Sequence, residues 1–238
     1  MAGVDFDDYV DDYREIINRV SSISGEEYEF FIQLRLGLMK SRLGEQAAGA
    51  TAVRILDFGC GTGSTETYLK ELFPNAVICG VDASAESIRA AREKNLEGVS
   101  FVHSDTLELP FPDGSFELIY SNGTYHHIDP AHHERVLLEM SRVCRTGGSL
   151  FIFENNPKNP LMMRAMRNNP FDKDTTVVPP ARLRERAEAA GFLGWELCYY
   201  FFFPKCLRHL RPLEKWLGWF PFGAQYFLWA RKPERSTT

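Results

Sequence analysis

Hydrophobic positions fall into two patterns, short continuous runs and amphipathic stretches, which alternate from residue 50 onward. The continuous runs are rich in β-branched residues and predict strands at 52–56, 76–81, 99–103, 116–121 and 149–154. The amphipathic stretches predict helices at 64–73, 85–95 and, after the capping pair Asp129-Pro130, up to Gly147-Gly148. Strands and helices that alternate at this spacing form right-handed βαβ units, with a parallel sheet covered on both faces. The pattern therefore predicts a doubly wound, Rossmann-like α/β domain.

The N-terminal part departs from this alternation. Residues 5–45 are acidic and helical in pattern. We expect residues 1–48 to form an N-terminal helical lid and residues 49–238 to form the main domain.

The C-terminal part carries two insertions, of which the first, the polar Asn- and Pro-rich stretch 155–180, is predicted to be a loop. A helix at 182–190 follows it. Runs at 195–203 and 224–230 predict two further strands, with the second insertion at 204–223 between them. If 205–218 folds as an inserted helix, these strands form an antiparallel pair. The sheet then has seven strands, mostly parallel, with an antiparallel last strand.

Composition is typical of a globular cytoplasmic protein. Hydrophobic residues make up 44% of the chain, enough for a sizeable core, and the formal charge of −5 gives no general attraction to nucleic acid. The five cysteines are scattered and include no CxxC pair, so neither a disulfide framework nor a cysteine-built zinc site is expected. The N-terminal residues lack the features of a secretory signal, and no apolar run is long enough to span a bilayer. We therefore expect a cytoplasmic localisation.

Candidate chemistry begins where the first strand runs into Leu56-Asp-Phe-Gly-Cys-Gly-Thr-Gly63. Three glycines at alternate positions allow a ligand to lie against the backbone at the start of the next helix. Asp57 would repel a pyrophosphate there and suits a cationic group. Asp82 follows 25 residues later, at the end of the second strand, where α/β folds place the acid that binds the ribose hydroxyls. Asp105 follows the third strand and could accept a hydrogen bond from an adenine amino group.

A ligand with a positive charge, a ribose and an adenine matches S-adenosylmethionine. At these motifs the chain resembles the class I S-adenosylmethionine-dependent methyltransferases, over roughly residues 50–155. The similar segments are the glycine loop, Gly80-Val-Asp-Ala-Ser84, Ser104-Asp105 with Leu109-Pro-Phe-Pro112, and Phe116–Ser121 followed by His126-His127.

The resemblance implies S-adenosylmethionine as cofactor and S-adenosylhomocysteine as product. It assigns the methionine side of the cofactor to Gly59, Gly61 and Gly63, the ribose to Asp82 with Ala83, and the adenine to Asp105 with Thr106. The remaining cofactor contacts that it implies are Tyr13, Asp57, Ser121 and Asn122.

Acceptor chemistry is expected beyond the fourth and fifth strands. His126 and His127 follow the fourth strand, and either suits a general base if the acceptor is protonated at working pH. Packing of one histidine within the loop is the alternative. Tyr9, Tyr125, Glu154 and Asn155 are predicted to line the acceptor space.

No metal site is expected. His126, His127, His132 and His133 straddle a turn and the start of a helix, and adjacent helical residues point to different faces. No cysteine or paired carboxylate lies at ligand spacing near them.

Basic and aromatic residues alternate with leucines in the second insertion, and Pro212 is expected to kink it. Packing on its own domain or on a twin subunit is favoured over peripheral membrane contact through 205–222, because a short kinked helix binds lipid only marginally.

The sequence favours methyl transfer to O, N or C of a small apolar or aromatic acceptor in a natural-product or glycoconjugate/lipid pathway. A non-catalytic regulatory or scaffold protein that binds the cofactor is an alternative. A nucleotide-dependent oxidoreductase is disfavoured because the glycine loop is not GxGxxG. Nucleic-acid methylation is disfavoured by the absence of an NPPY-type or DPPY-type motif after the fourth strand.

Overall fold

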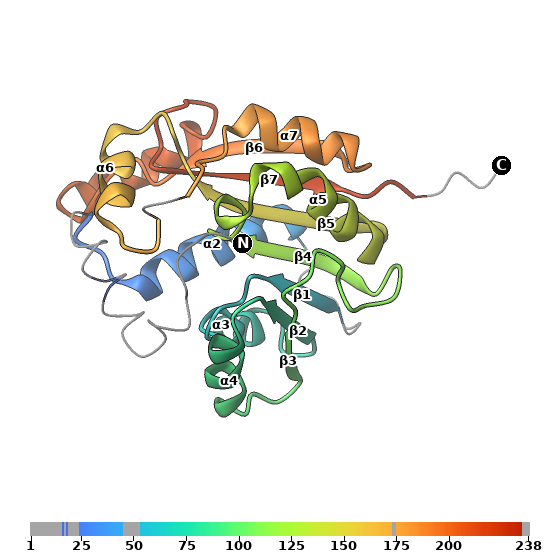
Figure 1. The fold of residues 1–238 in the computed structure, drawn as a ribbon. Helices are drawn as coiled ribbons and strands as arrows, with labels where there is room; N and C mark the ends of the chain where they lie inside the picture. Colours follow the sequence, from blue (N-terminus) through green and yellow to red (C-terminus); the bar gives the residue numbers. More distant parts are fainter. Residues whose placement is uncertain (1–15, 17, 19–23, 45–52, 173–174, 235–238) are drawn as a thin grey trace.

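A seven-stranded sheet with helices on both faces forms the body of the protein (Figure 1). The structure, a computed structural model, describes residues 16, 18, 24–44, 53–172 and 175–234. The strands are β1 (Arg54–Phe58), β2 (Val77–Asp82), β3 (Val99–His103), β4 (Phe116–Asn122), β5 (Cys144–Asn155), β6 (Leu193–Tyr200) and β7 (Gln225–Arg231). The α-helices are α2 (Tyr28–Leu43), α3 (Thr65–Leu72), α4 (Ala85–Glu93), α5 (His133–Val143), α6 (Pro160–Asn168) and α7 (Pro180–Ala189). The 3₁₀ segments are η4 (Tyr125–His127), η5 (Pro130–His132) and η6 (Lys205–Trp216).

The strand order is β3-β2-β1-β4-β5-β7-β6. The pairs from β3 through β5 are parallel, and β7 runs antiparallel to both of its neighbours. This topology confirms the predicted α/β fold with an antiparallel last strand. It also brings the carboxyl ends of β1, β2, β4 and β5 to one edge of the sheet, which we call the carboxyl edge.

Alternation along the strands sends one set of side chains to each face. Leu56, Ile119 and Ile152 pack beneath α5 and α7, while Ile55, Leu118 and Phe151 face the other side. Helix α2 covers that second face with Ile32, Leu36 and Met39, each 4% exposed or less. It therefore belongs to the core. The rest of the predicted lid, and its boundary at residue 48, lie largely outside the described residues.

Three predicted elements differ from the structure. The 155–180 insertion contains α6, which begins with Asn159 as N-cap and Pro160 in its first turn. Helix α5 ends at Val143, and Gly147-Gly148 lie inside β5 rather than ending the helix. The 204–223 insertion forms 3₁₀ turns that are interrupted by non-helical geometry at Leu207, in place of an amphipathic helix.

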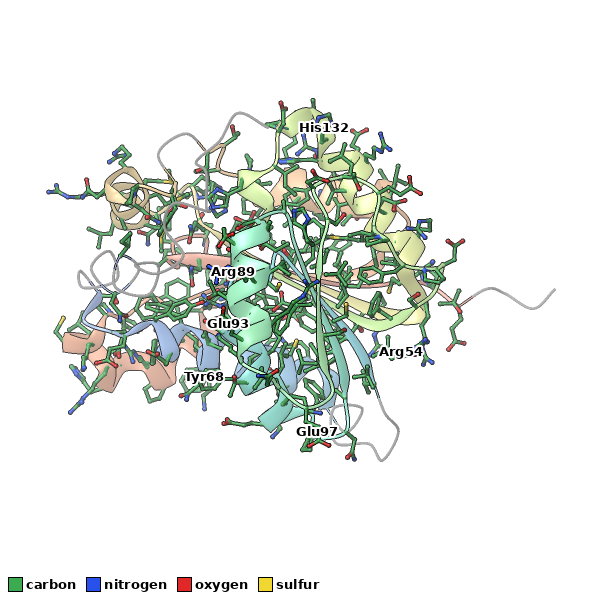
Figure 2. The ribbon with its side chains drawn as sticks, turned by 60° about the horizontal axis from the view of Figure 1, so that its bottom comes forward. Arg54, Tyr68, Arg89, Glu93, Glu97 and His132 are labelled. Carbon is green, nitrogen blue, oxygen red and sulfur yellow. The ribbon has the colours of Figure 1, made fainter. Side chains whose placement is uncertain are left out.

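No helix among the described residues is long and apolar enough to cross a membrane. The helices instead show polar outer faces. Figure 2 shows Arg89 and Glu93 on the outward side of α4, where their side chains form an exposed ion pair of 3.0 Å.

Candidate active site

The glycine loop joins β1 to α3 at the carboxyl edge. Gly59, Gly61 and Gly63 all have positive φ angles, of 77°, 53° and 71°. The backbone N–H groups of Gly59 and Cys60 donate to the Val81 carbonyl, which ties the loop to the end of β2. The predicted loop is therefore formed by backbone that only glycine adopts readily.

The three glycines face different surroundings. A Cβ on Gly59 would come within 2.1 Å of Thr124 Oγ1, and one on Gly63 within 2.8 Å of the Phe101 ring. A Cβ on Gly61 would meet nothing within 4 Å. The middle of the loop is thus open to a ligand, while its two ends are packed against the protein.

Asp82 lies next to this opening. Its Oδ2 accepts from the Gly61 N–H at 2.8 Å, and its Oδ1 accepts from the Ser84 N–H at 2.9 Å. These bonds fix the carboxylate at the end of β2, the position where α/β folds place the acid that binds the ribose hydroxyls. Ala83, Asp105 and Thr106 are exposed beyond the ends of β2 and β3, on the side where the adenine is expected.

Two more carboxylates lie beneath the loop. Asp57 is 2% exposed and Glu66, on α3, is 0% exposed. Burial raises the pKa of Glu66 to about 7. Burial, helped by the charges of Glu66 and Asp82, also raises the pKa of Asp57, and Arg35 on α2 opposes this rise. The floor of the loop is therefore a buried acidic layer with one cation, Arg35, on its far side.

Several buried polar atoms in this region have no hydrogen-bond partner among the described residues. They include both carboxylate oxygens of Glu66 and Oγ of Ser121 on β4. Buried polar atoms are almost always paired, so such a cluster indicates a missing ligand or bound water. Carboxylates and a hydroxyl around an open glycine loop suit a cation with polar groups, such as S-adenosylmethionine.

A histidine and carboxylate cluster lies beyond the end of β4. His126, 2% exposed, sits between two acids: Nδ1 lies 2.6 Å from Glu154 Oε2, and Nε2 lies 3.3 Å from Asp172 Oδ1. Burial works against protonation of His126, but the negative charges of Glu154 and Asp172 outweigh it and raise its pKa to about 10. His126 is therefore a fixed imidazolium at neutral pH.

His127 has the opposite electrostatics. Its Nε2 lies 3.5 Å from Asp172 Oδ1, and 19% of its side chain is exposed. Burial, together with the positive charge of His126, lowers the pKa of His127 to about 3. His127 is therefore a neutral imidazole at working pH.

The same cluster could hold a metal ion. One ligand atom each from His126, His127 and Asp172 lie within 4.8 Å of one another. A metal on His126 would have to displace the Nε2 proton that Asp172 accepts. The expectation of no metal thus stays a prediction, which chelation can test.

Comparison with known proteins extends this description. Residues 55–148 match the model of a methyltransferase domain family. This region is a class I S-adenosylmethionine-dependent methyltransferase domain. A fatty-acid O-methyltransferase of Mycolicibacterium smegmatis is 33% identical over 121 residues, covering 50% of this chain and 43% of that protein. A demethylmenaquinone methyltransferase of Thermus thermophilus is 38% identical over 108 residues, covering 44% of this chain and 48% of that protein.

The chain thus spans less than half the length of these two curated relatives. A solved structure from Thermotoga maritima, described as a methyltransferase and possible histamine N-methyltransferase, has the same fold over 95% of this chain and 98% of that one. Its TM-score is 0.67 and its sequence identity is 20%.

The structure buries two of the residues that are predicted to line the acceptor space of the methyltransferase domain. Tyr125 is fully buried in the core, where its hydroxyl donates to the His133 carbonyl at 2.7 Å. Glu154 is 2% exposed and both its oxygens are engaged, one by the Tyr125 N–H and the other by His126. Glu154 therefore holds His126 and the Tyr125 N–H in place.

Asn155, at the end of β5, accepts a hydrogen bond from Gln225 at 3.0 Å. Asn122 ends β4 next to the buried Ser121. Tyr9 and Tyr13 lie outside the described residues, so their predicted roles stay predictions. The described cofactor-side residues and the two histidines all lie at or just beyond strand ends at the carboxyl edge.

Sequence reasoning missed Asp172, Glu66 and Arg35. Asp172 comes from the insertion predicted to be a loop, and no spacing relates it to His126. Glu66 and Arg35 occupy helical segments in which charged residues are normally solvated. The single available signal was the position of Glu66 three residues after the last glycine of the loop.

Proposed function

We propose that the chain transfers a methyl group from S-adenosylmethionine to a hydroxyl, or another group that loses a proton, of a small lipophilic acceptor. The observation that carries the proposal is the position of His127, which is neutral, partly exposed and next to Asp172. It lies just beyond the end of β4, the strand whose last residues are predicted to face the sulfonium. A base in this position is needed only by an acceptor that must be deprotonated.

The cofactor half of the mechanism follows from the strand ends. Gly61 provides open backbone for the methionine part, Asp82 provides acceptors for the ribose, and Asp57 with Glu66 provides negative potential for the positive charge. When bound, S-adenosylmethionine supplies a methyl group on a cationic sulfur that leaves readily. The residues therefore contribute binding and alignment, which can lower a barrier by about 7–11 kcal/mol.

In the acceptor half, His127 acts as the general base. The acceptor oxygen forms a bond to the methyl carbon as the sulfur–carbon bond breaks, and the sulfur keeps the electron pair. The hydroxyl becomes strongly acidic as this bond forms, so a base of low pKa suffices. The proton passes to His127, and the negative Asp172 stabilises the resulting imidazolium. His126 is a positioning residue, because both of its ring nitrogens are engaged.

Two relatives support the lipophilic acceptor. By their names, they act on a fatty acid and on demethylmenaquinone, both apolar molecules with one polar reacting group. A regulatory protein that binds the cofactor without turnover is the alternative outcome of the following test.

The test measures cofactor binding and methyl transfer separately. Calorimetry with S-adenosylmethionine should show saturable binding, and a panel containing a fatty alcohol, a long-chain phenol and a reduced quinone should show formation of S-adenosylhomocysteine. His127→Gln should lower kcat by about 10²- to 10⁴-fold with little change in cofactor affinity. His132→Gln is the matched control, because His132 is exposed at the start of the next helix (Figure 2).

Asp172→Asn separates positioning from structure. It should lower kcat and shift the pH profile, since the neutral amide no longer stabilises the protonated His127. Equal turnover by wild type and His127→Gln on every active acceptor would remove the base. Cofactor binding without transfer to any acceptor would favour the regulatory alternative.

A further inference from the structure

Large apolar side chains lie exposed on the 204–223 insertion and on the neighbouring helix α6. Trp219 is 76% exposed, Trp216 61% and Leu161 64%. The other members of this surface are Leu207, Leu213, Phe220 and Phe222. Packing of the insertion onto its own domain therefore leaves its aromatic side chains uncovered. We call these seven residues the aromatic surface.

The insertion is held rigidly in this arrangement by its polar residues. The Glu214 carboxylate accepts the backbone N–H groups of Phe201, Phe202 and Phe203 at 3.0–3.2 Å. Arg211 donates to the Phe203 carbonyl and pairs with Glu26 at 2.7 Å. These contacts fix the backbone while the large side chains point outward, so the exposure is a property of the folded segment.

Two asparagines join the insertion to the segment after β5. Asn156 Nδ2 donates to the carbonyls of Pro221 and Gly223, and Asn159 Nδ2 donates to the Phe222 carbonyl at 2.8 Å. Asn159 is the N-cap of α6, so α6 and the insertion form one continuous surface. Figure 1 shows them side by side at one end of the sheet.

Exposed cations surround the aromatic surface. They are Lys158, Arg164 and Arg167 around α6, and Lys205, Arg208 and Lys215 on the insertion. The stretches 156–168 and 204–223 contain a single acid, Glu214, which is already engaged by backbone N–H groups. The surface is therefore positive as well as apolar, although the whole chain is acidic. Exposed tryptophans with lysines and arginines around them match the interface of an anionic bilayer, where rings enter the headgroup region and cations contact phosphates.

The register of the sheet places this surface at the carboxyl edge. Gln225, which begins β7, pairs with Asn155 at the end of β5, and Asn155 directly follows Glu154 of the histidine cluster. The insertion precedes Gln225 along the chain and bonds to Asn156. A bilayer against the aromatic surface would thus lie on the side of the molecule that carries the predicted acceptor site.

We propose that the aromatic surface docks the protein peripherally on an anionic lipid bilayer. Docking itself does not depend on methyl transfer. Its use, to present a lipophilic acceptor at the carboxyl edge, rests on the proposed function. A surface with two signals, apolar and basic, binds where either signal alone is marginal.

Vesicle flotation of the full chain tests the proposal without any turnover. Vesicles of phosphatidylglycerol and phosphatidylcholine should carry the protein at low salt, and phosphatidylcholine alone should carry much less. Added salt should weaken the binding, because it screens the cations. Lys205→Gln, Arg208→Gln and Lys215→Gln combined should reduce the partition coefficient by about 100-fold.

A second variant tests the apolar contribution. Trp216→Ala with Trp219→Ala should reduce partition by at least about tenfold. Trp195→Ala, an exposed tryptophan at the opposite end of β6, is the matched control and should float like wild type. Neutralising Arg135, Arg145 and Arg182 is the matched control for charge.

Failure of the wild-type protein to float on anionic vesicles at low salt would overturn the proposal. So would equal loss in the Trp195 control. If light scattering instead shows a dimer that Trp216→Ala with Trp219→Ala converts to a monomer, and vesicles carry neither, the surface belongs to a twin subunit. Flotation without methyl transfer would leave docking in place and overturn only the proposed activity.

Discussion

Replacing Glu66 by Gln should stabilise the protein at neutral and alkaline pH. Glu66 is fully buried on α3, and neither of its carboxylate oxygens has a partner among the described residues. Burial raises its pKa from the usual 4.5 to about 7. The protonated form is therefore the one that the fold accommodates, and ionisation opposes folding.

The size of the effect follows from the two pKa values. A folded-state pKa above the unfolded value means that the favourable contribution is complete below pH 4.5 and is lost as pH rises through about 7. Each unit of pKa corresponds to about 1.4 kcal/mol, so the ionised carboxylate costs about 3 kcal/mol on the alkaline side. Gln keeps the shape and cannot ionise. We expect Glu66→Gln to raise the free energy of unfolding by about this amount above pH 7 and to change it little below pH 4.5.

Urea unfolding across this pH range measures the difference directly. Glu71→Gln is the matched control, because Glu71 is an exposed residue of the same helix and should show no pH-dependent gain. A gain for Glu66→Gln that is the same at acid and alkaline pH, or a loss at alkaline pH, would refute the assignment of a buried, unpaired carboxylate.

Three further predictions concern the same edge of the sheet. Gly59→Ala should lower the free energy of unfolding by more than about 2 kcal/mol, because the new Cβ would overlap Thr124 and φ at this position is 77°. Gly61→Ala should lower it by about 1–2 kcal/mol and should mainly weaken cofactor binding. Urea unfolding and calorimetry distinguish the two effects. As pH rises through about 7 and Glu66 ionises, the affinity of the wild type for the cationic S-adenosylmethionine should increase more than its affinity for S-adenosylhomocysteine, whose sulfur is uncharged. Glu66→Gln should reduce this difference between the two ligands. Equal pH profiles for the two ligands in wild type would contradict the prediction. Dialysis against a chelator should leave turnover unchanged, since His126 already shares its protons with two carboxylates; loss of turnover that Zn²⁺ restores would assign a metal to this cluster.

Local patterns predicted most of the fold for a physical reason. Strands buried on both faces are continuous apolar runs, which is why the strands that end near Asp57 and Asp82 were recognisable. The turn glycines were recognisable because positive φ excludes other residues. The short helix α6 was missed although Asn159 and Pro160 provide its start signals, because the surrounding Asn and Pro residues favoured a loop.

The cofactor side of the site was more predictable than the acceptor side. The Gly61 N–H donates to the Asp82 carboxylate where two neighbouring strands end, so the order of the strands brings the two residues together. Asp172 reaches His126 from 46 residues away, through an insertion whose path no periodicity encodes. Burial of Glu66 was equally hidden, because it depends on the packing of α3 against the strands.

This division also bears on where acceptor specificity resides. The family match ends at residue 148, after the strands and turns that form the cofactor side and the two histidines. Glu154, which fixes His126, Asp172, which contacts both histidines, and the aromatic surface all come from residues beyond that point. A shared domain can therefore keep its cofactor chemistry while the insertions change both the residues around the proposed acceptor site and the proposed docking surface. Exchanging 155–180 between this chain and a relative should consequently alter the acceptor used before it alters the affinity for S-adenosylmethionine.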